Sequence, residues 1–180
     1  SAKFATSGQD CLAANRFYVE RPIYERFVAA FAGRVRALTV GVGSSDPDIG
    51  PLINTRAVAK HQTHVADALA KGARLVTGGK VHAAGENFFE PTVLADVPED
   101  AAIFREETFG PVVTLTAYDD LEAGIRRAND VDYGLSASVW SRNLKRARSV
   151  GARLQAGHVN INDCVAIAYS SKSAPSGGLK

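Results

Sequence analysis

Two hydrophobic periodicities alternate along the chain, and this alternation restricts the possible folds more than any other feature. Short apolar runs are typical of strands, and they occur at residues 74–77, 112–118, 135–140 and 158–161. Apolar residues three or four positions apart indicate helices, at residues 23–38, 58–69, 121–128 and 144–150. Such alternation favours a parallel sheet, because parallel strands need long crossover connections. We therefore expect an α/β fold with a twisted, mostly parallel sheet flanked by helices.

Proline and glycine mark the boundaries of several of these elements. Pro22 stands in the first turn of the first helix, where its missing N–H costs nothing, and Gly72 follows the second helix as a C-terminal cap. A run rich in Gly, Ser, Asp and Pro at residues 41–51 indicates a long loop. A further strand is expected at residues 88–94, at a sheet edge or interrupted by Pro91.

Length, charge and cysteine content exclude several classes of protein. The chain has 180 residues, 46% of them apolar, which is enough to bury a core in one or at most two domains. Its 21 basic and 19 acidic residues are balanced and unclustered, unlike those of a nucleic-acid-binding surface. No apolar run approaches the roughly 20 residues that span a bilayer. Two cysteines could form one disulfide but fit no secreted framework, so we expect free thiols in the cytoplasm, with neither nucleic-acid nor membrane partners.

Cys11 is the first candidate for chemistry. It lies in a small, polar setting after Gly8, and glycine allows a backbone to approach a ligand closely. We expect Cys11 on a loop leading into a helix, where free N–H groups and the helix dipole stabilise a thiolate. The alternative is an inert buried thiol, as most cysteines are. Cys164 is interpreted as a plain loop or core thiol.

The second candidate is the run from Arg105 to Pro111, which places two adjacent carboxylates before an aromatic residue and a Gly-Pro turn. Glu107 has the acceptors to bind the hydroxyls of a sugar diol, and Phe109 offers a stacking surface. Together with Glu106, it also has the charge to bind a cation. The alternative is a solvated loop without a ligand.

Two histidines three residues apart, His61 and His64, lie within the second expected helix. That spacing is compatible with a metal site, but no third ligand lies near them in the sequence. We therefore interpret both as solvated histidines on a helix and predict no metal site.

Several motifs, taken together, resemble those of the aldehyde dehydrogenase superfamily. The run FATSGQDCLA (residues 4–13) resembles the cysteine motif of that family, and ETFGP (107–111) resembles its second signature. The family separates these by about a hundred residues, and here Glu107 follows Cys11 by 96 positions. Further landmarks stand in the family's order: IGPL at 49–52, FEPT at 89–92, AND at 128–130, YGL at 133–135 and PSGG at 175–178. The resemblance covers essentially the whole chain.

The resemblance implies a three-layer catalytic domain at residues 1–180, with helices on both faces of the sheet. It implies that Cys11 attacks an aldehyde, that Glu107 holds the nicotinamide ribose of NAD or NADP, and that Phe109 packs near the nicotinamide ring. The sequences of residues 66–73 and 85–92 resemble those of succinate-semialdehyde dehydrogenases, although Ala5 stands where that group often has a substrate-binding Arg. Parent enzymes of this kind are expected to be homodimers or homotetramers.

The same resemblance implies parts that these 180 residues do not contain. A cofactor-binding domain would precede the cysteine motif, with the carboxylate that activates the deacylating water, and a bridging segment would follow. We therefore expect an excised catalytic domain that is inactive alone. Two alternatives stay open: a folded module without activity, and a different cysteine acyl-transfer enzyme that pairs Cys11 with His158.

Overall fold

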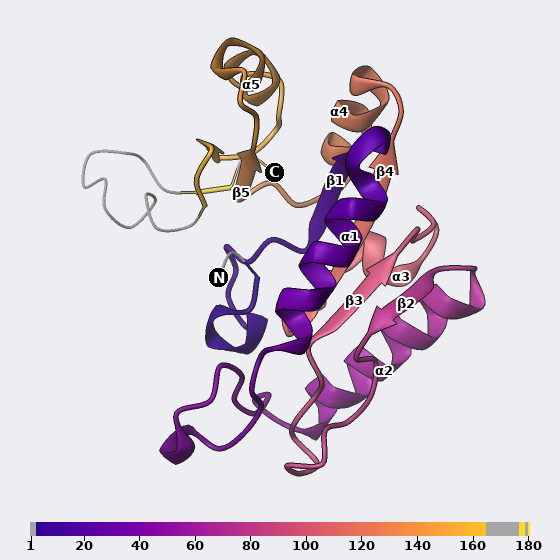
Figure 1. Cartoon of the computed structure of the whole chain (residues 1–180), viewed down its shortest axis with the longest axis vertical. Helices are drawn as coiled ribbons and strands as arrows, with labels where there is room; N and C mark the ends of the chain where they lie inside the picture. The colour runs from indigo at the N-terminus through magenta and orange to yellow at the C-terminus, as the bar shows by residue number, and fades with distance from the viewer. Residues whose placement is uncertain (1–2, 165–176, 179) are drawn as a thin grey trace. The chain divides into compact units, whose positions relative to one another are not determined.

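The structure, a computed structural model, describes residues 3–164, 177–178 and 180. These residues form two compact units, Lys3–Tyr118 and Asp119–Lys180 (Figure 1). The first unit contains both segments that the sequence singles out for chemistry. The second contains the last two helices and strands of the chain. The expected turn at residues 175–178 lies partly outside the described residues.

A four-stranded sheet organises the first unit. The strands stand in the order β1-β4-β3-β2 and are β1 (Arg16–Glu20), β4 (Val112–Tyr118), β3 (Thr92–Ala95) and β2 (Arg74–Thr77). Strand β4 is parallel to both of its neighbours, whereas the edge strand β2 is antiparallel to β3. The expected mostly parallel sheet is therefore confirmed, with an antiparallel edge.

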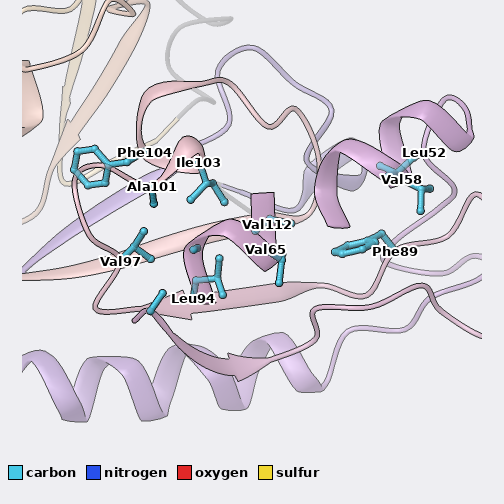
Figure 2. Close-up of a cluster of buried hydrophobic side chains, with 12 residues drawn as sticks. Leu52, Val58, Val65, Phe89, Leu94, Val97, Ala101, Ile103, Phe104 and Val112 are labelled. Atoms are coloured by element: carbon cyan, nitrogen blue, oxygen red, sulfur yellow. The ribbon is translucent and has the colours of Figure 1, made fainter. Parts of the chain in front are cut away.

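Helices cover both faces of this sheet because successive strand residues point to opposite sides. Val93 of β3 and Val113 of β4 pack against helix α1 (Arg21–Arg36). Their sequence neighbours Leu94 and Val112 pack on the other face with helices α2 (Thr55–Ala70) and α3 (Ala102–Arg105) (Figure 2). The three-layer arrangement expected from the family resemblance is thus present in the first unit.

Helix α1 buries a face slightly different from the expected one. Ile23 belongs to the expected apolar stripe but is 43% exposed, whereas Tyr24 is 2% exposed. The Tyr24 hydroxyl donates to the backbone carbonyl of Leu115 (2.9 Å) and accepts from the backbone N–H of Asp96 (3.0 Å). A buried hydroxyl needs such partners, and here it ties α1 to β3 and β4.

The strand expected at residues 88–94 and the loop expected at 41–51 differ from the structure in detail. The strand expected at residues 88–94 begins only at Thr92, because Pro91 lacks the N–H that a sheet interior requires. The loop at residues 41–51 contains a short 3-10 helix, η2 (Gly43–Ser45). Strand β1 and the short helix α3 were not expected at all. The strands at 74–77 and 112–118 are confirmed residue for residue.

The second unit contains helices α4 (Leu121–Asn129) and α5 (Leu144–Gly151) and a two-stranded parallel sheet of β5 (Ser136–Val139) and β6 (His158–Ile161). Asp120 and Asn143 cap the two helices, since their side chains accept from backbone N–H groups in the first turn. Among the described residues of the chain, no helix combines the length and apolarity needed to cross a membrane.

Candidate functional site

Cys11 lies on an exposed turn that leads into a strand, not into a helix as expected. Asp10 forms the turn: its carboxylate accepts from the N–H of Leu12 (2.8 Å) and its carbonyl from the N–H of Ala13 (3.0 Å). The chain then enters β1, whose aromatic and β-branched residues favour a strand. In the part of the chain that the structure describes, the helix expected to begin after Cys11 is therefore not present. Both cysteines are free, as expected.

The backbone before Cys11 has an unusual conformation. The short 3-10 helix η1 (Ala5–Gly8) contains three successive residues in the left-handed region, Thr6 (φ 48°), Ser7 (φ 58°) and Gly8 (φ 70°). Left-handed backbone costs a residue with a side chain about 1–2 kcal/mol, so surrounding contacts must hold this turn. Among the described residues, no hydrogen bond uses the backbone N–H of Cys11.

Four hydrogen bonds from residues 50–53, which cover the end of the IGPL segment and the residue after it, hold the cysteine turn. The Ser7 hydroxyl accepts from the N–H of Gly50 (2.9 Å) and donates to its carbonyl (3.1 Å). The Gln9 amide donates to the carbonyl of Pro51 (3.2 Å) and accepts from the N–H of Ile53 (2.9 Å). These bonds offset the backbone strain and explain why Ser7 and Gln9 accompany Cys11 in the motif.

The second candidate segment, Arg105 to Pro111, begins at the last residue of α3 and connects it to β4. Phe109 is in the left-handed region (φ 57°), although it is not a glycine, and its side chain is 40% exposed. Glu107 is half-buried and Thr108 is 4% exposed. Neighbouring structure therefore fixes this loop, and it presents an aromatic surface next to a carboxylate.

The structure brings the two candidate segments into direct contact through two glycines. A Cβ atom on Gly8 would lie 2.3 Å from the carbonyl oxygen of Gly110, and a Cβ on Gly110 would lie 1.8 Å from Nε2 of His61. The cysteine turn, the Glu107 loop and helix α2 are thus stacked without room for a methyl group. Both motifs belong to one packed region of the first unit, although 96 positions separate Cys11 from Glu107.

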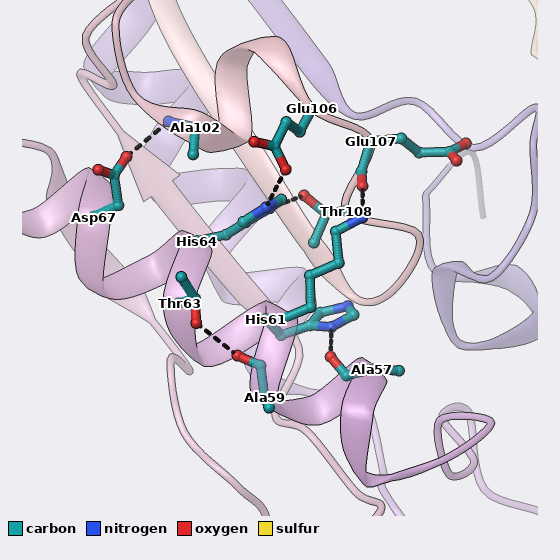
Figure 3. A network of polar contacts seen from close by, with 11 residues as sticks. Ala57, Ala59, His61, Thr63, His64, Asp67, Ala102, Glu106, Glu107 and Thr108 are labelled. Atoms are coloured by element: carbon teal, nitrogen blue, oxygen red, sulfur yellow. Dashed lines mark hydrogen bonds and ion pairs between the residues drawn. The ribbon is translucent and has the colours of Figure 1, made fainter.

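Side chains of α2 make contacts along the Glu107 loop (Figure 3). Lys60 donates to the backbone carbonyl of Glu107. His64 lies 3.0 Å from the Thr108 hydroxyl through Nδ1 and 3.3 Å from the Glu106 carboxylate through Nε2. His61 is bound through Nδ1 to the carbonyl of Ala57, on the preceding turn of its own helix (2.5 Å).

The histidines are buried, not solvated as expected: His61 is 0% and His64 is 3% exposed. Burial lowers the pKa of His61 to about 4, and nearby Lys3 adds to this effect. Burial also lowers the pKa of His64, against the opposing effect of Glu106. Both rings are therefore neutral at pH 7. Among the described residues, no group of three or more His, Cys, Asp or Glu is placed to hold a metal ion.

The low pKa of His61 predicts acid-sensitive stability. The unfolded chain binds a proton at His61 with a pKa near 6.5 and the folded chain only near 4. This contribution to the free energy of unfolding is therefore complete above pH 6.5 and is lost as the pH falls towards 4. His61→Gln cannot take up this proton and should flatten the pH dependence in that interval. Urea denaturation at several pH values measures how the free energy of unfolding changes with pH in the wild type and in the variant. Equal slopes in the two proteins would contradict the low pKa of His61.

Lys3 is a further buried ionisable group that the sequence interpretation missed. It is 2% exposed, and its ammonium group donates to the side-chain oxygen of Asn15 (2.6 Å). Burial lowers its pKa to about 7, although the negative charges of Glu107 and Asp10 oppose the shift. The carbonyl of Asn15 in turn accepts from the N–H of Thr114 in β4 (3.0 Å). Lys3 thereby ties the start of the cysteine motif to the sheet.

The order of motifs, the mostly parallel sheet and the contact between the two signatures agree with one family, and that family matches the chain over residues 1–180. The chain belongs to the aldehyde dehydrogenase family. It is 43% identical, over 99% of its length, to a succinate semialdehyde dehydrogenase of Acinetobacter baylyi. It is 45% identical, over its whole length, to the NADP(+) succinate-semialdehyde dehydrogenase of Escherichia coli.

A solved aldehyde dehydrogenase structure confirms the fold class. The crystal structure of succinate-semialdehyde dehydrogenase from Burkholderia pseudomallei is 45% identical, covers 98% of this chain and superimposes with a TM-score of 0.92. The chain covers 36% of that structure and 37% of each of the two curated relatives. It thus spans a little over a third of the length of these aldehyde dehydrogenases.

Proposed function

We propose that this chain is the cysteine-bearing catalytic domain of an NAD- or NADP-dependent aldehyde dehydrogenase. The observation that carries the proposal is the glycine-to-glycine contact between the Cys11 turn and the Glu107 loop. It puts an exposed thiol and a carboxylate suited to a ribose diol in one packed region. The cofactor-binding domain and the bridging segment are proposed to lie outside these 180 residues. Two free thiols agree with a cytoplasmic location.

The residues of the Glu107 loop fit a nicotinamide cofactor. A carboxylate offers two acceptor oxygens to the two hydroxyls of a ribose, and Glu107 is half-buried with its side chain directed away from α2 (Figure 3). Phe109 exposes 40% of its surface beside it, which is suited to contact with a planar ring. The cofactor, when bound, supplies the acceptor for the hydride that leaves the substrate.

In the proposed reaction, the Cys11 thiolate forms a C–S bond to the aldehyde carbon, and the carbonyl oxygen becomes an oxyanion. The N–H of Cys11, which has no hydrogen-bond partner among the described residues, is available to stabilise that oxyanion. Loss of hydride leaves a thioester on Cys11. Water then cleaves the C–S bond, which releases the carboxylic acid and restores the thiol. The net change is aldehyde, water and oxidised cofactor to acid, reduced cofactor and a proton.

The identity to two succinate-semialdehyde dehydrogenases supports an aldehyde with a carboxylate at its far end as substrate, of which succinate semialdehyde is the example to test. The complete enzyme should produce NADH or NADPH, followed at 340 nm, faster from succinate semialdehyde than from butyraldehyde. The 180-residue chain should give no steady production, since positioning the reactants is worth roughly 7–11 kcal/mol of the barrier. Reduced cofactor from neither aldehyde, or steady turnover by the chain alone, would contradict the proposal.

A further inference from the structure

We propose that His64 of helix α2, through its hydrogen bond to Thr108, is a positioning residue for the cofactor-binding loop that carries Glu107. The inference rests on the proposed function of Glu107 and adds the part of the chain that sets its position. His64 itself is buried and does not reach the surface at which a cofactor would bind. It holds the loop in position, and the loop carries the carboxylate that binds the cofactor.

The contacts from α2 follow the loop almost residue by residue. His64 follows His61 by three positions and Lys60 by four, so its side chain lies on the same side of the helix as theirs. Lys60 donates a hydrogen bond to the carbonyl of Glu107, and the ring of His61 fills the space beside Gly110. His64 contacts both Glu106 and Thr108, on either side of Glu107. Phe109 alone in this run lacks such a contact from these three side chains, and its side chain is exposed.

The hydrogen bonds of His64 assign its tautomer and make the bond to Thr108 directional. A carboxylate only accepts, so Nε2 of His64 carries the proton and donates to Glu106. In the neutral ring Nδ1 then has a lone pair, which accepts from the Thr108 hydroxyl. Thr108 is 4% exposed, so a change at either partner leaves the other polar group buried without a bond.

Helix α2 contacts the backbone of Glu107, whereas the Glu107 side chain takes no part in these contacts. The charged groups around His64 are Lys60 and Asp67 on its own helix and Glu106 on the loop. Lys60 and Asp67 therefore belong to α2, and Glu106 is the charged loop residue that contacts His64. The Glu107 side chain extends away from this network (Figure 3). Loss of the His64–Thr108 bond would therefore move Glu107 without removing its carboxylate.

The test compares KM values for cofactor and aldehyde in the complete enzyme, with NAD and NADP as cofactors. Glu107→Gln is the reference, because an amide presents one acceptor and a misplaced donor to the ribose. Thr108→Val keeps the shape of Thr108 but removes its hydroxyl. We expect Thr108→Val and His64→Leu each to raise the cofactor KM by about fivefold to tenfold, as for loss of one buried hydrogen bond. The aldehyde KM should stay near its wild-type value.

Thr63→Val is the matched control, because Thr63 lies beside His64 but, among the described residues, its hydroxyl bonds only to the carbonyl of Ala59 in its own helix (3.0 Å) (Figure 3). It should leave both KM values unchanged. The double variant His64→Leu/Thr108→Val should have a cofactor KM no higher than that of His64→Leu alone, since both substitutions remove the same hydrogen bond. If His64→Leu does not fold, Thr108→Val decides.

The possible results separate the inference from the proposed function. A raised cofactor KM in Glu107→Gln but not in Thr108→Val or His64→Leu would overturn the inference and leave the proposed function standing. An unchanged cofactor KM in Glu107→Gln would overturn the role of Glu107 and the inference with it. A loss of thermal stability alone, with unchanged KM, would make His64 merely structural and would also overturn the inference.

Discussion

Cys11→Ser in the complete enzyme is expected to lower kcat by at least about 10³-fold, because it removes the attacking atom of the proposed reaction. A serine hydroxyl has nearly the same size as the thiol but is almost fully protonated at neutral pH. Cys11 is exposed on its turn, so the substitution should leave the packing of the unit intact. Steady-state production of reduced cofactor measures the loss, and an unchanged Tm shows that the fold is retained.

Cys164→Ser is the matched control, since it makes the same change at the other free thiol, which lies in the second unit and is only partly exposed. It should retain wild-type kcat. Iodoacetamide should label Cys11 faster than Cys164 in the wild-type protein, and peptide mapping by mass spectrometry compares the two rates. A Cys11→Ser enzyme that keeps a kcat within tenfold of wild type would exclude Cys11 as the nucleophile.

The elements that could be predicted from the sequence are those whose signal is local. Residues 112–118 form a continuous apolar and β-branched run, so β4 was predicted with its observed ends. Strand β1 was not predicted, since the position of Cys11 after Gly8 favoured a helix in the residues that follow, although Phe17, Tyr18 and Val19 favour a strand. The contact between Gly8 and Gly110 depends on packing between distant segments, which residue spacing alone cannot give.

The buried polar groups were the main features that sequence interpretation missed. His61 was expected in solvent, yet it stands three residues after Val58 and four before Val65, both on the buried face of α2. That periodicity carries the signal for burial. The periodicity does not predict the hydrogen-bond partners of a buried histidine. Those of His64 are Thr108 and Glu106, on a loop more than forty positions away. Lys3 had no sequence signal for burial, because isolated lysines are usually exposed.

Gly110→Ala is expected to lower the free energy of unfolding by about 1–3 kcal/mol or more, the usual cost of overpacking a core. The backbone of Gly110 is not left-handed, so the cost is steric: the new Cβ would lie 1.8 Å from Nε2 of His61. His61 cannot turn away, because Nδ1 is bound to Ala57 and the ring packs on Phe89, with 5.4 Å between ring centroids. The Glu107 loop must move instead, so the complete enzyme should also bind cofactor more weakly.

Three further variants test this explanation for Gly110. His61→Ala removes the obstructing ring. The double variant Gly110→Ala/His61→Ala should therefore lose less free energy of unfolding than the two single variants lose together. Gly33→Ala is the matched control within α1, where the new Cβ would have no neighbour within 4 Å among the described residues apart from the adjoining backbone of its own helix. Because alanine favours a helix over glycine, Gly33→Ala should raise the free energy of unfolding by about 0.5–1 kcal/mol. Thermal and urea denaturation measure all four variants, and strictly additive losses in the double variant would show that His61 is not what excludes a side chain at position 110.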